Sequence, residues 1–135
     1  MGLFSLFNAE IAMDLGTANS IVIHNDQIVI DEPSIVAVNK ITNKIEAVGK
    51  KAQQMQGREN RNIETIRPLR DGVIADFEMA QHLIREFIKM TNATRSILPP
   101  ALRMVICIPS GITNVEERAV RESAEQAGAK EIRMI

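Results

Sequence analysis

The stretch that decides the fold reads Ala12-Met13-Asp14-Leu15-Gly16-Thr17-Ala18-Asn19-Ser20 and lies near the start of the chain. Apolar runs flank it on both sides, from Ile11 to Met13 and from Ile21 to Ile23. This pattern predicts a strand, a tight turn and a second strand. At the centre of the turn, Gly16 is expected to take a positive φ and to let the backbone approach a ligand closely.

The turn contains residue types that bind phosphate. The backbone amides of residues 16–19 can form an anion-binding concavity, and the side chains of Thr17 and Asn19 can donate to phosphate oxygens. Asp14 suits a hydrated Mg²⁺, which keeps its waters and needs few protein carboxylates. Because Asp-x-Gly-Thr is also an ordinary hairpin turn, these residues alone leave both interpretations open.

The glycines exclude two other kinds of nucleotide site. The seven glycines are isolated, at positions 2, 16, 49, 57, 72, 111 and 128, so the sequence has neither a G-x-x-x-x-G-K-[ST] nor a G-x-G-x-x-G motif. Any nucleotide is therefore expected on a hairpin and not on a loop that leads into a helix.

The composition is that of a globular domain, with 135 residues, 45% hydrophobic and 24% charged. A net charge of −1, four Phe and no Trp or Tyr give no sign of a nucleic-acid surface. The single cysteine, Cys107, cannot form an internal disulfide, which fits a reducing cytoplasm.

Two apolar segments lie outside the expected core. In residues 1–8, one broad helical face would carry Leu3, Phe4, Leu6 and Phe7. This segment is interpreted either as an amphipathic membrane-binding helix or as a terminus packed on the first strand. Ile97 and Leu98 precede two prolines in a long connection, where apolar residues are unusual; the alternative is that they fold back into the core.

Periodicity and turn residues predict the order of the elements. The expected strands are residues 11–15, 20–24, 27–31, 34–38, 44–48, 103–109 and 131–135, and the expected helices are residues 50–56, 77–90 and 114–127. Asn25-Asp26 is expected to form a two-residue hairpin turn, Pro33 to end a strand, and Asp76 to cap a helix. The nearly continuous apolar run 103–109 predicts a strand buried on both faces.

A meander followed by crossovers predicts an α/β fold, with a mixed sheet and helices on both faces. The strand that carries Asp14 should be central and lie beside the strand that ends at Pro109. Since ligands in such sheets bind beyond the carboxyl ends of central strands, Asp14 and residues 110–113 should meet at one edge.

Glu116 would then face the same edge from the first turn of a helix. It could position an attacking water. Alternatively, Thr113-x-x-Glu116 is a capping box, in which the acid only stabilises the start of the helix.

The motif Met13-Asp14-Leu15-Gly16-Thr17-Ala18-Asn19-Ser20 resembles the first phosphate motif of the actin, Hsp70 and sugar-kinase superfamily. Three later blocks resemble the bacterial actins of the MreB family: residues 31–38, 68–77 and 108–119. The resemblance implies an RNase H-like, actin-type subdomain IA, built from residues 9–32 and 68–135, and a small inserted subdomain IB, residues 33–67.

The resemblance also implies an ATPase that uses ATP and Mg²⁺ and polymerises into filaments. Such filaments would lie in the cytoplasm, at the inner face of the cell membrane, and would work with the cell-wall elongation machinery in shaping the cell. Asp14 would serve Mg²⁺ through water, Gly16, Thr17, Ala18 and Asn19 would hold the phosphates, and Glu116 would orient the hydrolytic water. The membrane contacts would be Leu3, Phe4, Leu6, Phe7, Ile97 and Leu98.

The sequence departs from the family pattern in two places. Glu117 stands where the family commonly has Arg, and the sequence stops at Ile135, before the second phosphate motif and the adenosine motif. Residues 1–135 alone are therefore expected to bind ATP weakly or not at all. An Hsp70-type chaperone ATPase and a small-molecule kinase of the same fold remain the alternatives.

Overall fold

The computed structural model describes residues 8–57, 62–91 and 101–135. The six residues expected to contact a membrane lie outside these ranges: Leu3, Phe4, Leu6, Phe7, Ile97 and Leu98. Among the helices that are described, none combines the length and the apolar character needed to cross a membrane.

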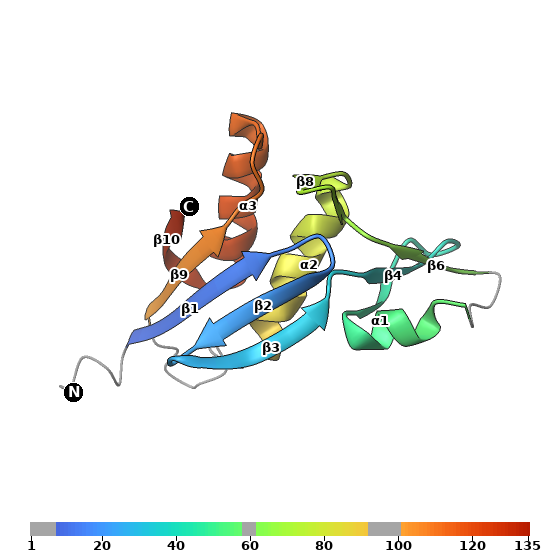
Figure 1. The fold of residues 1–135 in the computed structure, drawn as a ribbon, viewed down its shortest axis with the longest axis horizontal. Coiled ribbons are helices and arrows are strands. Elements are labelled where there is room, and N and C mark those ends of the chain that lie inside the picture. Colours follow the sequence, from blue (N-terminus) through green and yellow to red (C-terminus); the bar gives the residue numbers. More distant parts are fainter. Residues whose placement is uncertain (1–7, 58–61, 92–100) are drawn as a thin grey trace.

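A five-stranded mixed sheet forms the centre of the molecule (Figure 1). Its strands, in spatial order, are β10 (Ala129–Met134), β9 (Ala101–Cys107), β1 (Asn8–Leu15), β2 (Asn19–His24) and β3 (Gln27–Pro33). β1, β2 and β3 form an antiparallel meander, whereas β9 runs parallel to both β1 and β10. The predicted mixed sheet and the central place of the Asp14 strand are therefore confirmed.

Two long helices, α2 (Phe77–Met90) and α3 (Asn114–Gln126), cover one face of this sheet. Both begin at caps expected from the sequence: Asp76 accepts a hydrogen bond from Met79 N, and Thr113 from Glu116 N. The apolar stripe of α2 is buried, and it shares a single core with α3 and with alternate residues of the strands. The helix residues in this core are Leu83, Ile84, Phe87, Ile88, Val120 and Ala124, and the strand residues include Ile11, Met13, Val22, Met104 and Ile106.

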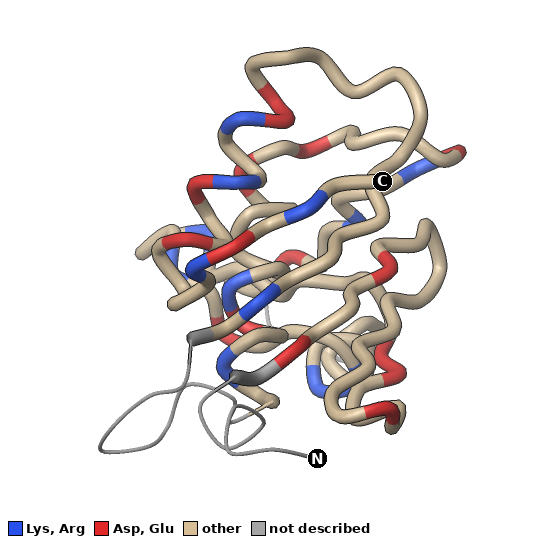
Figure 2. Tube along the Cα trace, turned by 90° about the vertical axis from the view of Figure 1, so that its left-hand side faces the viewer, with Lys and Arg blue, Asp and Glu red and all other residues tan. Residues whose placement is uncertain are grey.

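The expectation of helices on both faces is not met by the described residues, because α2 and α3 lie side by side on the same face. β9 is likewise not buried on both faces: Arg103 is exposed and Val105 is only half-buried. The opposite face carries ion pairs from Arg103 to Glu10 and Glu131, at 3.8 and 3.1 Å. Figure 2, which is turned by 90° from Figure 1, shows basic and acidic residues interspersed along the chain.

Most strands differ from their predicted boundaries by one to three residues; β4 (Val36–Asn39), β9 and β10, for example, were expected at residues 34–38, 103–109 and 131–135. Two of the differences have a clear physical reason. β1 starts at Asn8 and not at Ile11, because its pairing with β9 begins at Asn8 and Ala101. Pro33 does not lie beyond its strand but is the last residue of β3, where it pairs with Asn19. A proline is tolerated there since β3 is an edge strand. The Asn25-Asp26 turn is confirmed, with φ of 51° and 62° at its two residues.

A second, three-stranded sheet lies beside the first (Figure 1). It has the order β5 (Ile45–Val48), β4 (Val36–Asn39) and β6 (Ile63–Ile66), and α1 (Lys50–Met55) packs on it around buried Ile35, Ala37 and Ala52. The sheet falls within residues 33–67, although β6 was not predicted. A short hairpin, β7 (Leu69–Arg70) and β8 (Val73–Ile74), then leads into α2.

The cap at Asp76 can be tested by substitution. Asp76→Ala removes the acceptor of the Met79 N–H and should lower the free energy of unfolding by about 1 kcal/mol, whereas Asp76→Asn keeps a good cap and should change it much less. Urea denaturation of the three proteins measures the difference. Equal stability of the Ala and Asn variants would contradict the capping role.

Candidate phosphate-binding site

The candidate site is the turn between β1 and β2, residues 16–18, at the carboxyl end of β1. The loop that follows β9 lies at the same edge of the sheet, because β9 is parallel to β1 and Asp14 pairs with Cys107. Asp14 is exposed there and lies on the face opposite the helices. Asp14 and the loop after β9 therefore lie at the same edge of the sheet, as predicted.

Gly16 is required for a different reason from the one predicted. It does not have a positive φ, so that expectation is wrong. The close approach is real, however: a Cβ built on Gly16 would lie 2.3 Å from the carbonyl oxygen of Asn19. Since this neighbour is backbone and cannot rotate away, any side chain at Gly16 would force the turn to change shape.

Thr17 is held from outside the turn. Its Oγ1 accepts a hydrogen bond of 3.0 Å from the backbone N–H of Gly72. Gly72 and Asp71, with φ of 75° and 53°, form the tip of the β7–β8 hairpin. A hydroxyl that accepts one bond still has its own proton to donate, so Thr17 Oγ1 remains a donor for an anion.

The side chain of Asn19 is engaged within the sheet. Its Nδ2 donates to Asp31 Oδ1 at 3.1 Å, which directs the amide group toward β3. The contribution of Asn19 to an anion site is therefore expected from its backbone N–H. Ala18 has no polar side chain, and its carbonyl accepts a hydrogen bond of 2.9 Å from Ser34 N.

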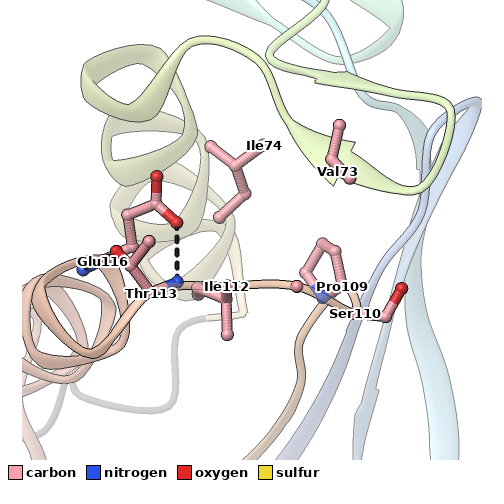
Figure 3. A pocket seen from close by; sticks show the side chains of 8 residues that line it. Val73, Ile74, Pro109, Ser110, Ile112, Thr113 and Glu116 are labelled. Carbon is pink, nitrogen blue, oxygen red and sulfur yellow. Dashed lines mark hydrogen bonds between the residues drawn. The ribbon is translucent and has the colours of Figure 1, made fainter.

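Glu116 lies at a small cavity beside this edge (Figure 3). The lining comes from β8, the loop after β9 and the start of α3: Val73, Ile74, Pro109, Ser110, Gly111, Ile112, Thr113 and Glu116. Asp14 does not line it. The volume of about 120 Å³ is well below the roughly 300–1,000 Å³ of small-molecule pockets, so this cavity alone does not enclose a nucleotide.

The carboxylate of Glu116 already accepts a hydrogen bond at the start of its own helix. Its Oε2 accepts a hydrogen bond of 3.0 Å from Thr113 N (Figure 3). Glu116 N in turn donates to Thr113 Oγ1 at 3.2 Å, which completes a capping box. This geometry favours the cap interpretation of Glu116.

The residues at the turn fit Mg²⁺ but not a tightly held metal ion. In the described part of the chain, no three His, Cys, Asp or Glu residues gather to hold a metal. Asp14 is a single exposed carboxylate. Such a group suits Mg²⁺, which is held largely by waters and by the phosphates of a substrate.

Two residues that shape the site, Gly72 and Ser34, were not predicted from the sequence. Gly72 holds Thr17, and Ser34 contacts the turn through both its backbone and its side chain. Ser34 follows a strand and Gly72 lies in a turn, and neither position carried a signal for contact with the Gly16 turn.

Comparison with known proteins identifies relatives along almost the whole chain. The family model described as MreB/Mbl protein matches residues 8–135. The cell shape-determining protein Mbl of Bacillus subtilis (strain 168) is 44% identical over 128 residues, which cover 94% of this chain and 38% of that protein. The cell shape-determining protein MreB of Escherichia coli (strain K12) is 43% identical over 135 residues, which cover 96% of this chain and 39% of that protein. The chain thus spans about two fifths of the length of these relatives.

Solved structures agree with this relationship. The crystal structure of MreB5 of Spiroplasma citri bound to ADP matches with a TM-score of 0.77 and 33% identity, over 95% of this chain and 38% of that one. The MamK double helical filament matches with a TM-score of 0.72 and 19% identity, over 94% of this chain and 40% of that one. At this identity the match shows a shared fold. The predicted α/β fold of the actin type is confirmed by these likenesses. The chain belongs to the MreB/Mbl protein family.

Proposed function

We propose that this chain is the phosphate-binding part of an actin-like ATPase that polymerises into filaments and directs cell shape. The observation that carries the proposal is the glycine-dependent turn at the carboxyl end of β1, in a chain whose relative MreB5 is known bound to ADP and to AMPPNP. The names of Mbl and MreB as cell shape-determining proteins support the cellular role.

In the proposed site, the chain binds and orients phosphate. The backbone N–H groups of residues 17–19 and the hydroxyl of Thr17 donate to phosphate oxygens. Asp14 holds Mg²⁺ through water. When bound, the ion neutralises part of the phosphate charge. These residues position the phosphates but include no nucleophile, as expected for a reaction in which water attacks.

The rest of the proposal concerns where in the cell the filaments lie. Filaments would lie in the cytoplasm, on the inner face of the cell membrane, anchored by the apolar residues of segment 1–8 and by Ile97 and Leu98. There they would guide the cell-wall elongation machinery. Sequence pattern and family resemblance support this part.

Residues 1–135 alone should bind ATP weakly. The cavity beside Glu116, at the edge where the turn lies, is too small to enclose a nucleotide. The chain also spans about two fifths of its relatives.

The proposed function is tested by pelleting the complete gene product with Mg²⁺-ATP, with and without anionic vesicles, and imaging the pellets by electron microscopy. We expect ATP-dependent filaments that bind vesicles, and loss of vesicle binding when Leu3, Phe4, Leu6 and Phe7 are changed to Ser. ATP hydrolysis without filaments under any condition would instead favour a chaperone or kinase of the same fold.

The requirement for Gly16 gives a second prediction. Gly16→Ala places a methyl group against the Asn19 carbonyl, which must move the donors of the turn, and should weaken ATP binding by the complete gene product about tenfold, the effect of losing about one hydrogen bond. Gly57→Ala is the matched control: it strains a backbone with φ of 81° but meets no atom within 4 Å. Equal affinity of the two variants, measured by calorimetry, would contradict the role of the turn.

Glu116 gives a third prediction, which separates its two interpretations. Glu116→Gln keeps the acceptor of a capping box and should leave both stability and the rate of ATP hydrolysis nearly unchanged. Glu116→Ala should lower the free energy of unfolding by about 1 kcal/mol. A large fall in kcat for Glu116→Gln at unchanged stability would show that Glu116 is catalytic, as the family resemblance implied.

A further inference from the structure

Ser34 lies where the two sheets meet. It follows Pro33, the last residue of β3, and precedes the sheet that begins at β4. The backbone turns sharply there, because Ile35 N donates to Pro33 O at 2.9 Å across a single residue. On its far side, Ile35 O accepts from Gly49 N, which fixes this junction to the start of α1.

Ser34 makes two hydrogen bonds to the turn that holds Gly16. Its backbone N–H donates to Ala18 O at 2.9 Å, and its hydroxyl donates to Gly16 O at 2.7 Å. The side chain is fully buried. Ser34 therefore holds two carbonyl groups of the turn, those of Gly16 and Ala18, toward itself.

A second buried hydroxyl completes this arrangement. Ser20 Oγ lies 2.8 Å from Ser34 Oγ, and Ser20 is also fully buried. A serine hydroxyl has one proton, and that of Ser34 goes to Gly16 O. Ser20 must therefore be the donor in this pair, so the chain of hydrogen bonds runs from Ser20 through Ser34 to Gly16.

These bonds determine where the amides of the turn point. No peptide bond in the described chain is cis, and in a trans peptide plane the C=O of one residue and the N–H of the next point in opposite directions. Holding Gly16 O toward Ser34 turns Thr17 N–H away from it, and holding Ala18 O toward Ser34 turns Asn19 N–H away from it. Both N–H groups belong to the proposed anion site.

We propose that Ser34 is a positioning residue for phosphate binding, which aims the Thr17 and Asn19 amides by holding the Gly16 and Ala18 carbonyls. Ser34 does not touch the phosphate. This inference rests on the proposed ATP-binding function, and it adds a residue outside the first phosphate motif to that site.

The test compares Ser34→Ala with Ser20→Ala in the complete gene product. Both substitutions remove one fully buried hydroxyl, but Ser20→Ala leaves the bond from Ser34 to Gly16 in place. We expect Ser34→Ala to weaken Mg²⁺-ATP binding about tenfold, the effect of losing one positioned hydrogen bond, and Ser20→Ala to weaken it less than about threefold. Melting temperatures of both variants show how much stability each has lost.

A spectroscopic measurement reports on the Thr17 amide itself. With ¹⁵N-labelled Thr, the Thr17 amide signal of the nucleotide-free protein should shift in Ser34→Ala, which loses the bond to Gly16 O, and stay in place in Ser20→Ala. Asn19 is not used as a reporter, because the backbone N–H of residue 34 still holds Ala18 O in both variants. A Ser34→Ala variant that binds ATP as the unmodified protein does would overturn the inference, whatever its stability.

Failure of the proposed function would look different. If the unmodified protein does not bind Mg²⁺-ATP, the ATP-binding proposal fails, and the Thr17 amide signal alone decides the inference about Ser34. A Thr17 shift confined to Ser34→Ala would support its positioning role, and a Thr17 signal that stays in place in Ser34→Ala would reject it.

Discussion

The parallel pairing of β1 with β9 is the constraint on which the rest of the structure depends. It joins Asn8–Asp14 to Ala101–Cys107, and parallel strands cannot be joined by a tight turn. The intervening chain must therefore cross over, and it carries the second sheet and α2 on the way. The register is fixed by burial: Met13 pairs with Ile106 in the core, and a slip of one residue would bring Asp14 there instead. The same register brings the ends of both strands to the edge where the candidate phosphate-binding turn lies.

Local features were predictable because they depend on neighbouring residues. Caps at Asp76 and Thr113, the apolar stripe of α2 and the Asn25-Asp26 turn each follow from a few residues whose preferences agree. Which face of the sheet the helices cover was not predictable, since an apolar run such as 103–109 does not say on which side a partner lies. Arg103 was the residue in that run that argued against burial on both faces, and it forms ion pairs on the open face.

The turn with Gly16 lies where the sequence predicted, at the carboxyl end of a central strand, but the contacts that shape it were not predicted. Gly16 was chosen for a positive φ, whereas the turn needs it because the Asn19 carbonyl leaves no room for a Cβ. The hydrogen bonds to Thr17 and Gly16 come from Gly72 and Ser34, which are 55 and 18 residues distant in sequence. Such contacts depend on how separate elements pack, and no periodicity or turn motif encodes them.

The result is a candidate phosphate-binding turn whose shape is held from two directions. Ser34 holds two carbonyls from the junction of the sheets, and Gly72 holds the Thr17 hydroxyl from the tip of the β7–β8 hairpin. A turn fixed in this way has its donors aimed before an anion arrives, so less conformational entropy is lost on binding and fewer dipoles need to reorient. An unsupported glycine turn would have to be ordered by the phosphate itself. The supports outside the motif are therefore part of the proposed binding site, together with the motif residues they hold.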